Sequence, residues 1–207
     1  MGFRMSFALA ALFAAQAVHG EVSVERGEDG RLALRRDGRA FAFVDAPAAD
    51  VALGWTVEND FVALTVAPAA SATNAVVREV RAPAIRLAEA LDRPVTLGSG
   101  GLRPLGEDPG SYGFLAVAEP VSRRGVVLGF LTAERGSGVF FSRNETGRAA
   151  IDPVVQYGRL ALDAGESVPG ETLLVGAFDD CRLGLEAYAD SAARAHAVRL
   201  PPQPAGY

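Results

Sequence analysis

Apolar residues recur at every second position through most of this chain, and this period restricts the fold more than any other feature of the sequence. Val51, Leu53, Trp55 and Val57 alternate with small or polar residues, the pattern of a β-strand with one face on a core. The same alternation, or a short apolar run between turn residues, predicts further strands at 22–24, 32–34, 41–43, 62–66, 114–118, 126–132, 139–141, 160–162 and 173–178. Many short strands at near-regular spacing predict an all-β fold, a sandwich of two antiparallel sheets.

Turn residues separate these expected strands. Gly27–Gly30 and Arg36–Arg39 contain Asp-Gly steps of the kind that tight hairpins require. The segments 67–73 and 98–110 are rich in small residues, glycine and proline, and we expect both to be loops.

The C-terminal part has a different period and predicts a helix. Asp180 is suited to cap a helix that runs from Cys181 to about Val198, where Pro201–Pro202 prevents its continuation. One face of this helix carries Leu185, Tyr188, Ala189, Ala192 and His196. We expect residues 179–207 to be a helix and a proline-rich linker toward a further domain, and residues 21–178 to be the sandwich.

The first twenty residues have the organisation of a secretory signal peptide. Arg4 precedes an uncharged run from Met5 to Val18, and small residues follow it. The run is shorter than the about 20 apolar residues of a membrane-spanning helix, so cleavage is favoured over an uncleaved anchor. The sequence thus predicts an exported bacterial protein, periplasmic or extracellular, with no membrane contact after cleavage.

Composition excludes several classes of function. The formal net charge is −5, lysine is absent, and the arginines are scattered or paired, so there is no basic stripe for nucleic acid. The single cysteine, Cys181, cannot form an intramolecular disulfide or a CxxC site. Only His196 remains after removal of the signal peptide, which excludes a multi-histidine zinc site. We expect no metal or other cofactor.

Two C-terminal segments resemble a known family. Asp-Asp-Cys-Arg-Leu-Gly-Leu-Glu-Ala-Tyr-Ala-Asp at 179–190 and Leu-Pro-Pro-Gln-Pro-Ala-Gly-Tyr at 200–207 look like the domain junction of melibiase and raffinose-synthase type α-galactosidases. Residues 110–113 and 129–135 also resemble the N-terminal domain of that family. The resemblance implies an antiparallel β-supersandwich, galactose-mutarotase-like, with a C-terminal helix that leads into a catalytic (β/α)8 barrel.

The resemblance also implies what this chain does not do. Family members are retaining glycoside hydrolases whose two catalytic aspartates belong to the barrel. No position here corresponds to either, and Tyr207 stands where the first barrel strand would begin, so we expect the chain to be inactive alone. The loop that reaches toward the sugar in many relatives contains a tryptophan, which the nearest stretch here, 96–101, lacks. Residues expected at the interface with the barrel are Asp179, Arg182, Tyr188 and Tyr207.

Several residues admit both a functional and a structural interpretation. Trp55 and Tyr112 are aromatic candidates for stacking on a carbohydrate, although the apolar neighbours of Trp55 at i±2 favour the core, and Tyr112 fits a loop anchor. The pair Asp179–Asp180 has the composition of an acid–base pair, but helix capping explains Asp180 better. His196 is expected to be a half-buried packing residue of the helix face rather than a catalytic one.

Three functions follow, from different classes. The first is a non-catalytic accessory domain of an α-galactosidase-like enzyme, whose partner is the barrel and whose 183–193 helix face should then be exposed and apolar. The second is a stand-alone exported carbohydrate-binding or adhesion module that contacts an oligosaccharide. The third is a small sandwich enzyme that uses carboxylates.

Overall fold

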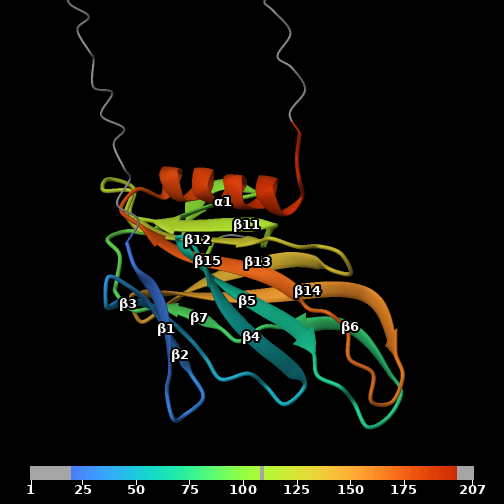
Figure 1. The fold of residues 1–207 in the computed structure, drawn as a ribbon. Helices are drawn as coiled ribbons and strands as arrows, with labels where there is room; N and C mark the ends of the chain where they lie inside the picture. Colours follow the sequence, from blue (N-terminus) through green and yellow to red (C-terminus); the bar gives the residue numbers. More distant parts are fainter. Residues whose placement is uncertain (1–19, 108–109, 200–207) are drawn as a thin grey trace, which may run out of the picture.

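Two antiparallel sheets packed face to face form the body of the protein, as predicted (Figure 1). The computed structural model describes residues 20–107 and 110–199. Residues 1–19 of the expected signal peptide and residues 200–207 of the expected linker lie outside these residues. The elements are β1 (Val22–Arg26), β2 (Leu32–Arg36), β3 (Arg39–Val44), β4 (Val51–Glu58), β5 (Phe61–Pro68), β6 (Ala75–Arg81), β7 (Ile85–Leu87), β8 (Val95–Gly98), β9 (Gly101–Pro104), β10 (Ser111–Tyr112), β11 (Phe114–Ala118), β12 (Gly125–Phe130), β13 (Ser137–Glu145), β14 (Arg148–Leu162), β15 (Glu171–Phe178) and α1 (Cys181–Ala195).

Each sheet combines strands that are consecutive in the sequence with strands that are far apart in it. Sheet A has eight strands in the order β1-β2-β3-β7-β14-β13-β10, with β6 paired to β14 beside this path. Sheet B has seven strands in the order β4-β5-β15-β12-β11-β8-β9. The two-residue hairpin between β2 and β3 has positive φ at both Asp37 and Gly38, 51° and 76°, which suits the right-handed twist of the paired strands.

The main core lies between the sheets. Its centre is formed by fully buried aliphatic side chains from both inner faces, among them Leu34, Ile85, Leu115, Ile151 and Leu173. Because successive side chains of a strand point to opposite faces, the predicted alternation of apolar and polar residues places the apolar ones on the inner face of each sheet.

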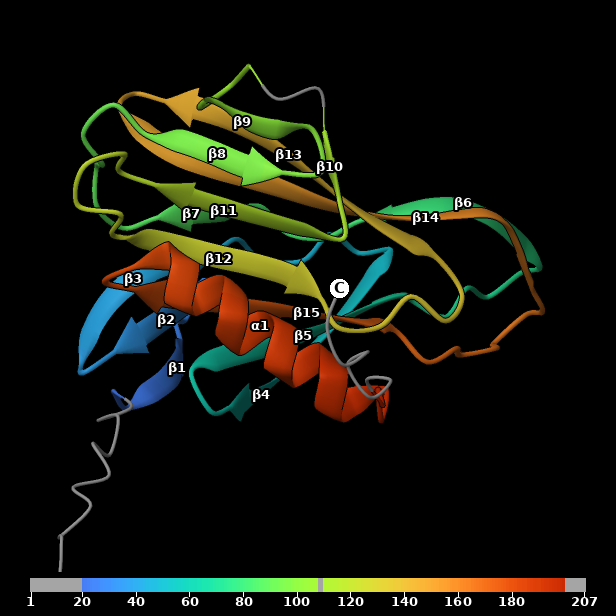
Figure 2. The ribbon, with the colours of Figure 1, turned by 90° about the horizontal axis from the view of Figure 1, so that it is seen from above.

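The helix α1 covers the outer face of sheet B (Figures 1 and 2). A second apolar cluster lies beneath it, formed by Phe61, Ala63, Ala116, Val127, Leu174, Phe178 and Cys181. The helix begins after Asp180 as predicted and ends at Ala195, three residues before the predicted end. Its apolar face is therefore occupied within the domain, and the expectation of a wholly exposed apolar face over 183–193 is wrong, although Leu183 itself is exposed.

Two further expectations are corrected. The segment 98–110 is not only a loop, because β9 pairs with β8 in a short hairpin that extends sheet B. The alternation at 160–162 marks only the end of β14, whose register with β6 shifts between Gln156 and Leu160. The first part of β14 has buried apolar residues on both faces, and the part around the register shift is irregular. Neither part shows the period of two that the prediction used.

Candidate functional site

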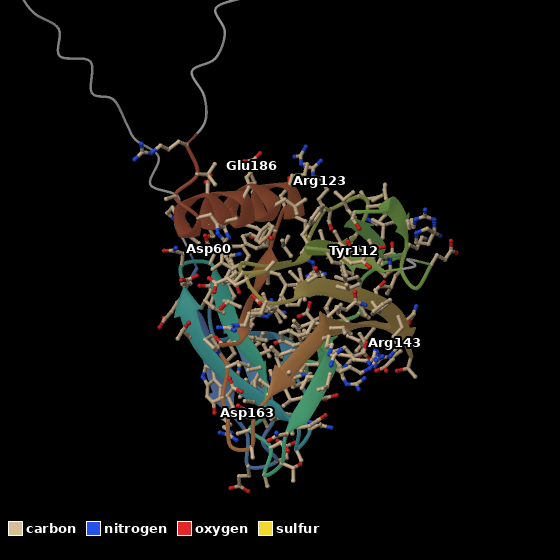
Figure 3. All side chains as sticks on the ribbon, turned by 90° about the vertical axis from the view of Figure 1, so that its right-hand side faces the viewer. Asp60, Tyr112, Arg123, Arg143, Asp163 and Glu186 are labelled. Atoms are coloured by element: carbon tan, nitrogen blue, oxygen red, sulfur yellow. The ribbon has the colours of Figure 1, made fainter. Side chains whose placement is uncertain are left out.

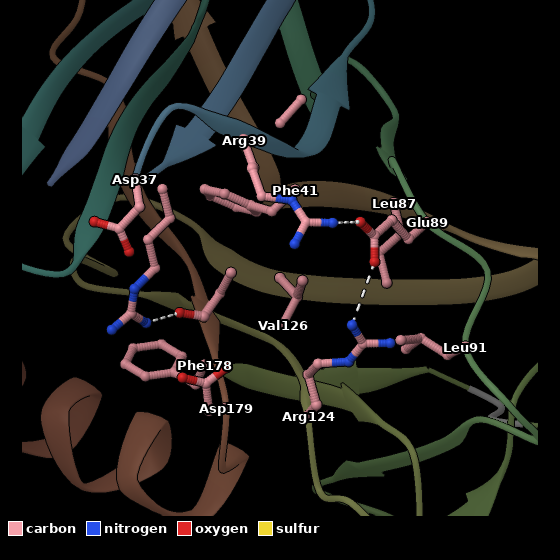
Figure 4. Close-up of a pocket in the computed structure, with 14 residues that line it drawn as sticks. Asp37, Arg39, Phe41, Leu87, Glu89, Leu91, Arg124, Val126, Phe178 and Asp179 are labelled. Atoms are coloured by element: carbon pink, nitrogen blue, oxygen red, sulfur yellow. Dashed lines mark hydrogen bonds and ion pairs between the residues drawn. The ribbon is translucent and has the colours of Figure 1, made fainter. Parts of the chain in front are cut away.

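A cleft of about 220 Å³ opens between the two sheets, close to the point where β15 runs into α1 (Figure 4). Its floor is apolar and is formed by Phe41, Leu87, Val126 and Phe178. Its rim carries charged side chains from both sheets and their connections, namely Arg36, Asp37, Arg39, Glu89, Arg124 and Asp179. An apolar floor with a few converging polar groups is the usual composition of a small-molecule site.

Ion pairs organise one side of this rim. Glu89 lies between two guanidinium groups, with Arg39 at 2.8 Å and Arg124 at 3.3 Å. Arg124 also contacts Glu119 at 3.3 Å. A hydrogen bond from the Ser122 hydroxyl, then one from the Asp92 amide, holds the pKa of Glu119 below its usual value. The pairs are exposed, so they fix geometry more than they stabilise the fold.

The other side of the rim is held by Arg36. Its guanidinium donates to the carbonyl oxygen of Ala177 and lies 5.4 Å from the centroid of the Phe178 ring. Asp37, next in sequence, accepts a hydrogen bond of 3.0 Å from the amide of Glu21. Three arginines and three carboxylates balance formally, so the rim suits a neutral polar ligand better than an anion.

The junction between β15 and α1 is fixed by Asp180. Its carboxylate accepts from the Arg182 amide at 3.0 Å, which confirms the predicted cap, and from Arg123 Nε at 2.9 Å. The hydrogen bond from the Arg182 side chain, and then the cap and Arg123, hold the pKa of Asp180 well below its ordinary value despite some desolvation. This geometry does not support an acid–base role for Asp179–Asp180, because the Asp180 carboxylate already accepts hydrogen bonds from the Arg182 amide and from the side chains of Arg123 and Arg182.

Close backbone contacts seat α1 on sheet B. A Cβ atom at Gly184 would lie 2.5 Å from Cδ2 of Phe178 and 2.8 Å from Cγ2 of Val127. One turn further, the Tyr188 hydroxyl donates to the carbonyl oxygen of Phe130 at 2.8 Å. At the end of the helix, His196 Nε2 lies 2.7 Å from the carbonyl oxygen of Leu131, but the residue is exposed and not half-buried as expected, because it lies beyond the last helical residue.

The two aromatic candidates lie on different sheets. Trp55 lies on the inner face of β4, opposite the buried Leu64, yet it is 36% exposed. Burial in the core was expected and is wrong, because β4 is an edge strand of sheet B. The guanidinium of Arg26, from β1 of sheet A, lies 5.7 Å from the centroid of the indole ring.

Tyr112 is 58% exposed and lies on the side of the molecule toward α1 (Figure 3). Its amide donates to the Ser99 hydroxyl at 3.0 Å, and the Ser99 amide donates to the Ser111 hydroxyl at 2.8 Å. These two bonds, each between a backbone amide and a serine hydroxyl, connect the β8–β9 turn to β10. They do not involve the ring of Tyr112, which stays in contact with solvent. Neither aromatic residue lines the cleft.

The four residues expected at a domain interface have different environments. Asp179 lies on the cleft rim, and Arg182 is exposed beside Asp180. Tyr188 is half-buried against sheet B, where burial raises the pKa of its hydroxyl. Tyr207 lies outside the described residues. An interface role stays a prediction for all four.

Glu171 is a buried carboxylate that the sequence analysis missed. It accepts hydrogen bonds from the Thr132 hydroxyl at 2.6 Å and from the amides of Glu134, Arg135 and Gly136 at 3.2, 2.8 and 3.1 Å. Burial raises its pKa, but these four bonds together lower it by more, so the pKa lies below its usual value. The only signal in the sequence is a lone glutamate at the start of an apolar strand.

The described residues contain no group of three or more histidine, cysteine, aspartate or glutamate side chains placed to hold a metal ion. Across 20–107 and 110–199, no helix is long and apolar enough to cross a membrane.

Comparison with known proteins gives similarity in structure only. No family model matches the chain, and no curated protein matches it. The α-galactosidase from Lactobacillus brevis is similar with 13% identity and a TM-score of 0.49, over 87% of this chain and 28% of that one. A galactose mutarotase related enzyme from Lactobacillus acidophilus is similar with 10% identity and a TM-score of 0.42, over 76% and 71% of the two chains. This chain thus spans less than a third of the length of the α-galactosidase.

Proposed function

We propose that this chain is the non-catalytic N-terminal β-sandwich portion of an exported α-galactosidase-like glycoside hydrolase. In this proposal it supports a (β/α)8 barrel that hydrolyses α-galactosides. One observation carries the proposal: the segment 179–190, whose sequence resembles the α-galactosidase junction, is the segment that locks α1 onto sheet B. Asp180, Gly184 and Tyr188, three members of that segment, make the cap, the close approach and the hydrogen bond.

The contacts of α1 with the sandwich fix the orientation of the helix. A helix held at its start by Asp180, along its length by Tyr188 and at its end by His196 has one fixed direction relative to both sheets. A domain that follows such a helix receives a defined position instead of a range of positions. The groups offered outward are Asp179, Arg182 and the exposed Leu183, which we assign to the contact with the barrel.

The test compares two proteins. The chain alone should show no turnover of an aryl α-galactoside above the rate of a mock purification. The product of the gene extended through the DNA that follows Tyr207 should contain a barrel and hydrolyse the same substrate. Turnover by the purified chain alone, or an extension that encodes no barrel, would contradict the proposal.

A second candidate is a stand-alone exported carbohydrate-binding module, and the cleft favours it. Its volume of about 220 Å³ is below the roughly 300–1,000 Å³ of ligand sites for larger molecules, so a single small ring fits it better than an oligosaccharide does. The Arg39–Glu89–Arg124 group places donors and an acceptor side by side, an arrangement that can bind two neighbouring hydroxyls. The apolar floor, with Phe41 and Phe178, suits the C–H face of a sugar.

Saturation-transfer NMR with galactose, glucose and mannose separates the two candidates. A binding module should show saturation of one sugar by the native chain and at least tenfold weaker binding by Arg39→Ala. The matched control is Arg148→Ala, an exposed arginine away from the cleft. No binding by the native chain, at millimolar sugar, would exclude this second candidate and leave the accessory function untouched.

A further inference from the structure

A second hollow, of about 450 Å³, lies between the β4–β5 turn and the C-terminal half of α1. It shares no lining residue with the cleft described above. Its volume falls within the roughly 300–1,000 Å³ of small-molecule sites. We name it the turn–helix hollow, and its lining residues are Asn59, Asp60, Phe61, Ala187, Asp190, Ser191 and Arg194.

The local sequence of α1 explains why space remains here. The four helix residues that line the hollow have the spacing i, i+3, i+4 and i+7, so they share one face of the helix. Two of them, Ala187 and Ser191, have small side chains. Opposite this face, the two-residue turn between β4 and β5 has a φ of 51° at Asn59. Figure 3 shows Asp60, the other turn residue, beneath α1.

Polar groups in the hollow are held by the fold. Asp60 is only 7% exposed although it carries a carboxylate, and Ser191 is 8% exposed. The Ser191 hydroxyl donates to the carbonyl oxygen of Ala187 at 2.9 Å and accepts from the guanidinium of Arg194 at 3.0 Å. A guanidinium has five N–H donors, and this bond uses one of them.

The charges that line the hollow favour a cation. Two carboxylates, of Asp60 and Asp190, stand against one guanidinium, of Arg194, which leaves one negative charge in excess. Glu58, immediately before the turn, adds a further negative charge nearby. A concave surface with an excess of one sign raises the local concentration of the opposite ion.

A metal ion fits this lining less well than an organic cation does. Over residues 20–107 and 110–199, no three histidine, cysteine, aspartate or glutamate side chains are placed to hold a metal. The guanidinium of Arg194 in the same hollow would also repel a divalent ion.

We propose that the turn–helix hollow binds a small hydroxylated organic cation of the amino-sugar class. The carboxylates of Asp60 and Asp190 bind its ammonium group, because charge-assisted hydrogen bonds are the stronger ones. The Asn59 amide, which both donates and accepts, and the guanidinium of Arg194 bind its hydroxyls. Phe61 supplies an apolar contact for the ring. The site lies wholly within this chain, so it does not depend on the proposed accessory function.

Calorimetric titration of the whole chain with galactosamine and with galactose tests the ligand class. Galactosamine should bind, and galactose, which has a hydroxyl in place of the ammonium group, should bind at least about tenfold more weakly. Absence of galactosamine binding at tens of millimolar sugar, or equal affinity for the two sugars, overturns the proposal.

A matched pair of variants tests the location. Asp190→Asn removes one charge at nearly constant size from an exposed position, and it should weaken galactosamine binding about tenfold without changing the urea midpoint. Glu186→Gln makes the same change of charge one turn earlier on α1, on the outward side of the helix (Figure 3), and should leave binding unchanged. Native affinity in Asp190→Asn, or an equal loss in both variants, overturns the assignment of the site.

Discussion

The aromatic ring of Tyr188 on α1 lies directly against the α-carbon of Gly129 on β12, so closely that a Cβ atom at position 129 would overlap the ring. The Tyr188 hydroxyl extends past this contact and donates to the carbonyl oxygen of Phe130 at 2.8 Å. Gly129 is therefore required for close approach of the helix to the sheet. The pair is one of the contacts that fix the helix on the sandwich.

Replacement of Gly129 should loosen that contact. Gly129→Ala introduces a methyl group into space held by Tyr188, and overpacking of this kind costs about 1–3 kcal/mol in the free energy of unfolding. Urea denaturation measures the change. Gly100→Ala is the control, because a Cβ atom there has its nearest neighbour at 3.6 Å, and it should differ from the native chain by less than about 0.5 kcal/mol. Equal midpoints for all three proteins would mean that α1 is not seated as described.

A double-mutant cycle should show that the two residues act through one contact. In a Tyr188→Ala background the ring is absent, so Gly129→Ala should cost less than in the native background. Directly contacting residues typically show interaction energies of about 0.5–3 kcal/mol. Additive changes, measured in the same urea experiments, would place the effect of Gly129→Ala elsewhere.

The carboxylate of Glu171 should determine part of the acid stability. Glu171→Ala leaves one hydroxyl, the buried amide of Gly136 and two partly buried amides without an acceptor, and we expect a loss of about 3 kcal/mol. The folded pKa of Glu171 lies below the unfolded value of roughly 4.3, so its contribution is complete above that pH and is lost as pH falls through the folded pKa.

The milder variant Glu171→Gln should therefore have an unfolding free energy that falls less steeply below about pH 4 than that of the native chain. Glu28→Gln, at an exposed turn residue, is the control and should retain the native slope. Parallel acid limbs for all three proteins would exclude this role of Glu171.

Cys181 should be unreactive in the folded chain. Burial, and secondarily the negative charge of Asp180, raises the pKa of its thiol to about 12. The thiolate is the reactive form, so a disulfide reagent at pH 8 should react more than about 100-fold more slowly than in 8 M urea. Fast reaction of the native chain would show that the start of α1 detaches from the sheet.

Much of the fold follows from local pattern. The alternation in β4 and β5 and the Asp-Gly turn between β2 and β3 specify strands and hairpins within a few residues. Asp180 likewise specifies the start of the helix. The burial of Trp55 does not follow in the same way, because its neighbours show which face it occupies but not how far the opposite sheet extends over that face.

The cleft could not be predicted from the sequence for a similar reason. Arg36, Glu89, Arg124 and Asp179 are separated by long stretches of chain, and no short motif contains two of them. They meet because β2, β7 and β15 end, and β12 begins, at one side of the sandwich. Such a meeting depends on strand order, which the period of two leaves open.

Hydrogen exchange, followed by mass spectrometry on the folded chain, tests most directly whether α1 is an integral layer of the sandwich. If it is, peptides from Cys181–Ala195 should exchange as slowly as those from β12 and β15, and Tyr188→Ala should speed exchange in the helix more than in sheet A. Exchange of the helix at the rate of an unfolded peptide, while the sheets stay protected, would contradict the account.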